Sequence, residues 1–186
     1  EYEHFLDAIS DKDISFYAFE ILYWTGIREG ELLALTPEDF DLDAATLTIS
    51  KSFARRNGKD VIGPPKTKMS YRTIVLSDFL VEEIRTWFEY ADFAEGERIF
   101  PRTKSFLHHE MDRGCLKSGV KRIRIHDLRH SHVSMLIHMG FSAVAIAARM
   151  GHESQEITFR YAHLFPDVQD DMANSLQGIS DERKKR

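Results

Sequence analysis

The sequence predicts an α+β fold that is mainly helical and contains one small three-stranded antiparallel sheet. Most of the chain carries apolar residues at helical spacing, and glycines end several of these runs. Segments 46–52 and 71–76 have the alternating or β-branched character of strands. Between them, Asn57-Gly58 is the strongest short hairpin signal, so we expect the chain to turn back there and supply the third strand.

The predicted helices have recognisable starts or stops. The first spans 13–25 and ends at Gly26, and a short one around 31–35 ends at Pro37. Ser77 or Asp78 can cap the next helix, and Gly119, Gly140 and Gly151 end later ones. The further expected helices lie at 78–93, 105–118, 126–139, 142–151, in a short stretch after Ser154, and at 166–176.

Composition indicates one globular domain. The 186 residues are 42% hydrophobic and 30% charged, which is an ordinary balance for a globular protein. No apolar run approaches the roughly 20 residues that a membrane-spanning helix needs, so no membrane partner is expected. The only cysteine, Cys115, cannot form an internal disulfide and is consistent with a reducing cytoplasm.

Charge is unevenly distributed along the chain. The net charge of −5 argues against a nucleic-acid partner, and residues 1–50 hold twelve acidic and two basic side chains. Residues 51–72, however, hold seven basic side chains and one acidic, and residues 113–130 hold six and one. Basic patches on an acidic body can still attract DNA, although a solvated charged surface is the simpler interpretation of charge alone.

The motif HDLRH at residues 126–130 carries the densest chemistry. On a helix, His126, Arg129 and His130 share one face. A guanidinium can bind phosphate with two hydrogen bonds, and an imidazole can move a proton near neutral pH. A zinc site is the alternative, because two histidines are spaced i, i+4. Asp127 stands where zinc proteases need Glu, and Arg129 would be unfavourable beside a metal ion.

Three other segments hold candidate polar residues. In TGIREGEL at 25–32, Arg28 follows a helix end and Glu31 can brace it. In PPKTKMSYR at 64–72, Lys66 lies near the tip of a strand connection. His152 and Tyr161 are nine residues apart, so a single straight helix would place them on opposite sides, and a break is needed to bring them together.

Taken in order, these four segments resemble the tyrosine recombinases, particularly integrases of temperate phages and conjugative transposons. The resemblance covers about residues 5–176 and rests on TGIREGEL, PKTKMSYRTI, HDLRH, and MGH followed by RYAH. It implies that Tyr161 is the nucleophile and that Arg28 and Arg129 grip the scissile phosphate. It further implies that His126 and His152 are the two active-site histidines.

The resemblance assigns two supporting roles as well. Lys66 matches the lysine of the sheet connection and would protonate the leaving 5′-oxygen, with Lys68 as the competing candidate. Glu31 matches a supporting carboxylate. Because a tyrosine hydroxyl has a pKa near ~10, it needs a proton acceptor, and His126 is the residue expected to serve. The predicted DNA-binding residues are Arg55, Arg56, Lys68, Arg72, Lys121, Arg122 and Arg124.

The implied function is site-specific DNA cleavage and rejoining through a 3′-phosphotyrosyl intermediate, in integration and excision of a mobile element. No metal or cofactor is expected, since two arginines and the imidazoles can stabilise the charge of the transition state. The expected partners are double-stranded DNA and further copies of the chain, in a tetramer formed through the C-terminal helix. The resemblance also implies a bacterial or phage-encoded protein of the cytoplasm.

Three other functional classes stay open at this point. A type IB topoisomerase or a telomere resolvase would share the phosphotyrosine chemistry without a synaptic tetramer. A metal phosphohydrolase and a non-catalytic DNA-binding module are the others. In the expected organisation, residues 1–178 form the catalytic domain, 179–186 form a charged, disordered tail, and the N-terminal core-binding domain of such integrases is absent.

Overall fold

The computed structural model describes residues 1–65, 67–151, 160–165 and 176–177, and all structural statements below concern these residues. Its α-helices are α1 (Tyr2–Ile9), α2 (Asp13–Thr25), α3 (Glu29–Leu32), α4 (Asp78–Ala91), α5 (Lys104–Ser118), α6 (Ile125–His138) and α7 (Ala143–Met150). Short 3-10 turns are η1 (Pro37–Asp39), η2 (Lys68–Ser70) and η3 (Ala162–Leu164). None of the described helices is both long and apolar enough to cross a membrane.

The strands form two small antiparallel sheets. The first has three strands, β1 (Phe40–Asp41), β2 (Thr46–Ile49) and β5 (Arg72–Val75), in the order β1-β2-β5. The second is the hairpin of β3 (Ser52–Arg56) and β4 (Lys59–Gly63), which turns at Asn57-Gly58 as expected. Both turn residues have positive φ, as a tight hairpin turn requires.

The mainly helical α+β class with a three-stranded sheet is confirmed, but the sheet differs in which strands it contains. The segment expected as one strand, 46–52, divides into β2 and the start of β3. The break falls next to Lys51, whose ammonium lies 2.7 Å from an Asp39 carboxylate oxygen. The hairpin of β3 and β4 forms a separate sheet, and β1 is the third strand of the three-stranded sheet.

Helix α1 was not predicted from the sequence. Its buried residues are only Phe5 and Ile9, spaced i, i+4, which is too short a pattern to stand out. The helix packs on α5, where Gly114 allows close approach: a Cβ there would lie 2.4 Å from the Phe5 ring. The expected helix after Ser154 and most of the one at 166–176 lie outside the described residues.

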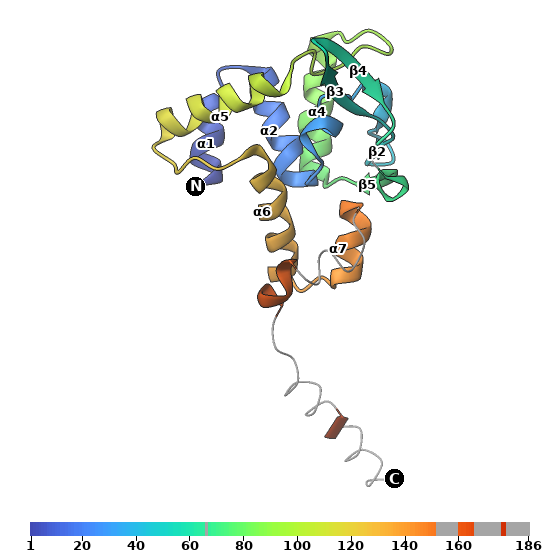
Figure 1. Cartoon of the computed structure of the whole chain (residues 1–186), viewed down its shortest axis with the longest axis vertical. Helices are drawn as coiled ribbons and strands as arrows, with labels where there is room; N and C mark the ends of the chain where they lie inside the picture. Colours follow the sequence, from blue (N-terminus) through green and yellow to red (C-terminus); the bar gives the residue numbers. More distant parts are fainter. Residues whose placement is uncertain (66, 152–159, 166–175, 178–186) are drawn as a thin grey trace.

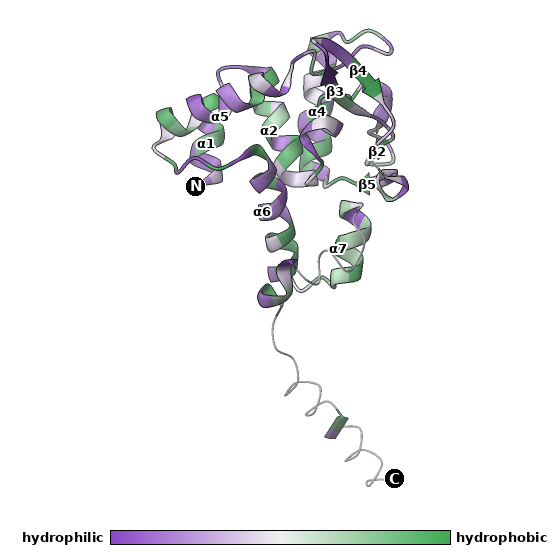
Figure 2. Ribbon diagram, in the orientation of Figure 1, coloured by the Kyte–Doolittle hydropathy of each residue, from purple (hydrophilic) through white to green (hydrophobic). Residues whose placement is uncertain are grey.

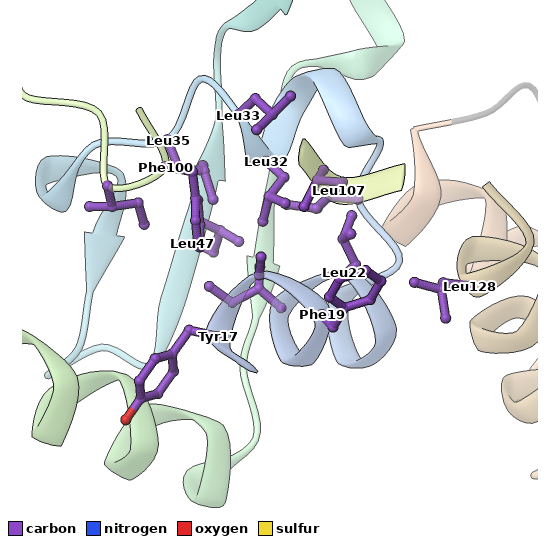
Figure 3. Packing of buried hydrophobic residues seen from close by; sticks show 14 of the residues in the cluster. Tyr17, Phe19, Leu22, Leu32, Leu33, Leu35, Leu47, Phe100, Leu107 and Leu128 are labelled. Atoms are coloured by element: carbon purple, nitrogen blue, oxygen red, sulfur yellow. The ribbon is translucent and has the colours of Figure 1, made fainter. Parts of the chain in front are cut away.

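Two hydrophobic clusters divide the molecule. The larger joins α1, α2, α4, α5 and the three-stranded sheet, and Figure 3 shows Leu128 of α6 approaching Phe19 and Leu22 of α2 at its edge. The smaller contains Val133 and Ile137 of α6 together with Ile146, Ala147, Met150 and Tyr161. Helix α6 therefore spans both clusters and leaves the main body at its far end (Figure 1).

Helix α7 lies beside the outer part of α6 and close to β5. It is largely hydrophobic, whereas α6 mixes hydrophilic and hydrophobic stretches (Figure 2). Ser142 caps α7 by accepting a hydrogen bond from the Ala145 N–H (3.2 Å), as the sequence suggested. A short apolar helix of this kind depends on packing rather than on its own propensity.

Gly26, the C-cap of α2, marks the point where α2, α6 and α7 meet. Its φ is +66°, and a Cβ there would lie 2.7 Å from both the His132 ring and the Met150 methyl group. Gly119, the C-cap of α5, has a similar φ of +73° with nothing within 4 Å of the added atom. The two glycines share the backbone constraint and differ in the space around them.

We expect Gly119→Ala to lower the free energy of unfolding by about 1 kcal/mol, the cost of a left-handed alanine. Gly26→Ala should cost about 1–3 kcal/mol more, because overpacking adds to the same backbone cost. Urea unfolding of both variants measures the difference. Equal losses would show that α6 and α7 do not approach α2 this closely.

Candidate active site

Arg28 enters the site from the turn between α2 and α3. Its backbone N–H donates to Glu31 Oε2 (2.9 Å) and its guanidinium donates to Glu31 Oε1 (2.8 Å). Glu31 therefore caps the first turn of α3 and fixes the Arg28 side chain relative to its own backbone. The Arg28 guanidinium also reaches the Ser70 hydroxyl (3.3 Å) and the Gly151 carbonyl (3.4 Å). The Arg28 side chain is 32% exposed, which leaves it accessible to a ligand.

Arg72, predicted as a DNA contact, instead completes this network from β5. It donates to both Glu31 carboxylate oxygens, at 2.8 and 3.2 Å, and its Nε donates to the Arg149 carbonyl (2.9 Å). Its side chain is only 6% exposed, so its guanidinium faces the protein interior. We therefore reassign Arg72 from DNA contact to a residue that holds Glu31 and the end of α7.

Glu31 stays ionised despite its burial. Burial acts to raise the pKa of this carboxyl, but hydrogen bonds and charge from Arg72, and then from Arg28, outweigh it and hold the pKa below its ordinary value. A carboxylate between two guanidinium groups keeps both in place and separates their charges. Glu31 thus pairs with Arg28, as its position in the sequence allowed, and with Arg72 as well.

Arg129 lies at the centre of the site. It is 2% exposed, and its guanidinium donates to the carbonyl oxygens of Gly26 (2.5 Å) and Met150 (2.6 Å). Burial first, and then the charge of Arg28, lowers its pKa to about 9. Arg129 is therefore still mostly cationic at neutral pH, and it joins the ends of α2 and α7 to α6.

His130 of α6 contacts Tyr161, and His126, one turn earlier, packs against His130. The His126 and His130 rings meet edge to face with centroids 4.8 Å apart. The Tyr161 hydroxyl contacts Nδ1 of His130, while its ring packs in the smaller cluster and the residue is 6% exposed. The expected partner of this hydroxyl was His126, which is exposed to solvent. His130 was noted in the sequence motif but given no role.

The two histidines are neutral in this setting near pH 7. Burial lowers the pKa of His130, and the charge of Arg160 adds to the effect. Burial also lowers the pKa of His126, with His130 as the next contributor. Arg28 and Arg129 both contribute to that shift, which places His126 within electrostatic range of the two arginines.

A family model described as the phage integrase family matches residues 1–167. The chain belongs to this family. It is 31% identical to the ICEBs1 integrase of Bacillus subtilis (strain 168) over 96% of the chain and 53% of that protein. It is 29% identical to the integrase of Mycobacterium phage L5 over 84% of the chain and 46% of that protein. The chain thus spans about half the length of these curated relatives.

Solved structures place the fold of this phage integrase family member among tyrosine recombinase catalytic domains. The catalytic domain of bacteriophage HP1 integrase aligns with a TM-score of 0.65 at 19% identity, over 96% of this chain and 92% of that one. A Tn1549 transposon integrase aligns with a TM-score of 0.73 at 21% identity, over 100% of this chain and 64% of that one. The fold prediction and the family resemblance are confirmed.

The structure brings together Arg28, Glu31, His126, Arg129 and Tyr161. Lys66 and His152, the other predicted active-site residues, lie outside the described residues. Among the residues that the structure describes, no group of three or more metal-ligating side chains is found. The site of this integrase-family chain is therefore a cluster of guanidinium, imidazole and phenol groups around one buried carboxylate.

The other predicted DNA-binding residues lie on the surface in two places. Arg55 and Arg56 are on the β3–β4 hairpin and Lys68 begins η2. Lys121, Arg122 and Arg124 precede α6, and all six are exposed. Arg122 pairs with Asp112 (2.6 Å) and Arg124 with Asp127 (2.7 Å), so a phosphate would compete with carboxylates there.

We expect Arg72→Gln to lower the free energy of unfolding by about 3 kcal/mol, because it removes a partner from a buried carboxylate. Arg72→Gln combined with Glu31→Gln should recover part of that loss, since the buried carboxylate charge that Arg72 compensates is then gone as well. Chemical denaturation of the single and double variants forms the cycle. Additive losses would mean that the pair is not coupled.

The pH dependence gives a second measure of this pair. The pKa of Glu31 is lowered in the fold, so its contribution is present above the unfolded-state pKa and is lost as the pH falls through the folded-state pKa. The Glu31→Gln variant should lack this acid-dependent part of the stability. An unchanged acid profile would contradict the assignment.

Proposed function

We propose that this chain is the catalytic part of a site-specific DNA recombinase that integrates and excises a mobile element. Family membership supports this, and one observation carries it: the Tyr161 hydroxyl contacts an imidazole of α6 beside the buried Arg129, itself within electrostatic range of Arg28. Arg28 precedes Arg129 by 101 residues in the chain, and His130 and Tyr161 are 31 residues apart. The apolar packing of the Tyr161 ring does not require a hydroxyl that contacts histidine, so this contact favours a chemical role.

The proposed chemistry uses these groups without a metal. Tyr161 attacks the scissile phosphorus, the bond from phosphorus to the 5′-oxygen breaks, and a 3′-phosphotyrosine and a free 5′-hydroxyl result. Arg28 and Arg129 stabilise the negative charge of the transition state. Because Tyr161 is 6% exposed, its side chain must become more accessible before a DNA phosphate reaches it. His152 is proposed as a second imidazole at the phosphate.

The proposed partner is double-stranded DNA. The Tn1549 transposon integrase, which shares the fold, was solved in complex with transposon right end DNA. On this chain, DNA would lie along the exposed basic residues of the hairpin, of η2 and of the segment before α6. We also propose a tetramer on DNA through the segment 166–176, and a location in the cytoplasm, where a lone Cys115 stays reduced.

We expect Tyr161→Phe to abolish the covalent DNA adduct, because the hydroxyl is the proposed nucleophile. The substrate is a nicked duplex selected from a randomised library by SDS-resistant attachment to the unmodified chain. The melting temperature should change little, since the ring keeps its apolar packing. An adduct formed by the phenylalanine variant would contradict the proposal.

The same assay separates the alternative functional classes. Adduct formation should persist in EDTA, and loss that added divalent ion restores would favour the phosphohydrolase. A recombinase should transfer strands between two labelled duplexes and should need more than one copy of the chain to do so. A topoisomerase should rejoin each duplex to itself. A chain that binds duplex DNA but forms no adduct with any library member would be a binding module.

For the general acid we propose Lys66, with Lys68 as its matched control two residues away. A bridging 5′-sulfur makes the leaving group a thiolate, which departs without protonation. Lys66→Ala should therefore be slow on normal DNA, by a factor on the order of 10²–10⁴, and largely rescued on the sulfur substrate. Lys68→Ala should lose at most some binding. Rescue of Lys68→Ala alone would move the role to Lys68.

A further inference from the structure

His132 of α6 and Arg149 of α7 form a pair next to the candidate active site. His132 is 2% exposed, and Nε of Arg149 donates a hydrogen bond to its Nε2 (3.2 Å). The ring fits there because it lies against a glycine: a Cβ added at Gly26 would be 2.7 Å from it. The pair therefore connects α6 to α7 beside the end of α2.

Arg149 makes two further hydrogen bonds with other nitrogens of its guanidinium group. Nη1 donates to the Val75 carbonyl of β5 (3.0 Å), and Nη2 donates to the Trp24 carbonyl of α2 (3.4 Å). Because the group is planar and its donors point in fixed directions, three acceptors on three elements leave it one orientation. Arg149 thereby fastens α7 to α6, β5 and α2.

Three consecutive carbonyl groups at the end of α7 accept hydrogen bonds from three guanidinium groups. The pairs are Arg149 with Arg72 (2.9 Å), Met150 with Arg129 (2.6 Å) and Gly151 with Arg28 (3.4 Å). The last carbonyl groups of a helix lack partners within the helix and carry a partial negative charge. The end of α7 is therefore an acceptor surface for both arginines that are proposed to bind the scissile phosphate.

We propose that His132 and Arg149 are positioning residues for DNA cleavage. Their hydrogen bond, with the two further bonds of Arg149, holds the end of α7 so that its carbonyl groups orient Arg28 and Arg129. The inference rests on the proposed function, because it concerns the groups that bind the scissile phosphate in that reaction. A displacement of about 1 Å in such a support can cost on the order of 100-fold in rate.

His132 is a neutral ring near pH 7 and can accept this hydrogen bond. Burial first, and then the charge of Arg149, lowers its pKa to about 4, while the Tyr23 backbone acts in the opposite direction. The other charged groups that act on the pair are Arg129 of α6 and Arg72 of β5. Nε2 accepts only in the tautomer that carries its proton on Nδ1. A protonated ring would have no lone pair at Nε2 and would add a positive charge beside Arg149.

Two substitutions at His132 separate the hydrogen bond from the volume of the ring. His132→Phe keeps a planar ring and lacks the acceptor, whereas His132→Gln places an amide oxygen near the position of Nε2. Arg149→Lys keeps the positive charge and removes the Nε donor. His138→Phe, at an exposed histidine at the end of α6, is the matched control. Melting temperatures establish that each variant is folded.

The first test needs no DNA, so it stands apart from the proposed function. In the full chain with isotopically labelled arginine, NMR follows the Nε–H groups of Arg149 and Arg28, each identified by its lysine substitution. His132→Phe should speed hydrogen exchange at Arg149 by about tenfold or more, because a hydrogen bond from a charged donor is lost. It should also shift the Arg28 resonance, whereas His132→Gln and His138→Phe should leave both groups nearly unchanged.

The second test measures adduct formation at saturating concentrations of the selected nicked duplex. His132→Phe should be slower by on the order of 100-fold, and His132→Gln by less than about tenfold. The dissociation constant for the duplex should change by less than about threefold in both, because the exposed basic residues are untouched. His138→Phe should cleave at the unmodified rate. A loss of rate without a loss of affinity, restored by the conservative variant, distinguishes positioning from a general loss of structure.

Arg149→Lys shows whether the two residues act as a unit. It should slow adduct formation as much as His132→Phe does. The double variant should be slower than either single variant by less than about threefold, because both substitutions break the same hydrogen bond. Deficits that multiply in the double variant would contradict the inference.

Other results would overturn the inference as well. One is a folded His132→Phe or Arg149→Lys variant that cleaves at the unmodified rate. Another is an equal deficit in His132→Phe and His132→Gln, which would assign the loss to the shape of the ring. If His132→Phe does not fold, the rate of Arg149→Lys decides. If the unmodified chain forms no adduct, the proposed function fails, and the Arg28 resonance in the first test alone decides whether the pair positions that residue.

Discussion

The site depends on the ionised carboxylate of Glu31. This residue is 2% exposed and binds the guanidinium groups of Arg28 and Arg72, which come from the α2–α3 turn and from β5. Arg72 extends the link to α7 through the Arg149 carbonyl (2.9 Å). An unpaired carboxylate at this depth would be costly, so its two partners are held where the charge is satisfied. The position of Arg28, and through Arg72 that of α7, follows from this pairing.

Helix α6 carries three further side chains of the site, His126, Arg129 and His130. Its first half is anchored by Leu128 in the main cluster, and its second half supplies Val133 to the smaller one. Between them, Arg129 donates to the carbonyl oxygens of Gly26 and Met150. The same cation is the one proposed to bind the scissile phosphate. Stability and proposed catalysis thus draw on the same side chain.

Neighbouring residues in the sequence were sufficient to predict turns and helix ends, because these features are formed by residues that are close in the chain. The Asn57-Gly58 turn demands positive φ at both positions, so the hairpin was predictable from two residues. Glycine C-caps at Gly26, Gly119 and Gly151 likewise end the predicted helices, because a left-handed residue ends the helical hydrogen-bond pattern. The partition of strands between two sheets was not predictable, since pairing depends on contacts between distant segments. Helix α1 was missed because it buries only two residues along its length.

The sequence by itself determined the family and the mainly helical α+β class, because these depend on motifs that are contiguous in the chain. It also supplied Arg28, Glu31, His126, Arg129 and Tyr161 as candidate residues of the site. Only the tertiary structure decided which of these side chains contact one another. Arg72 looks like any basic residue of a charged segment until the fold places it against a buried carboxylate. His126 and His130 are equivalent in sequence, and only the packing of Tyr161 against the second turn of α6 brings its hydroxyl to His130. Spacing along a helix defines a shared face, but the partner that meets that face comes from elsewhere in the chain.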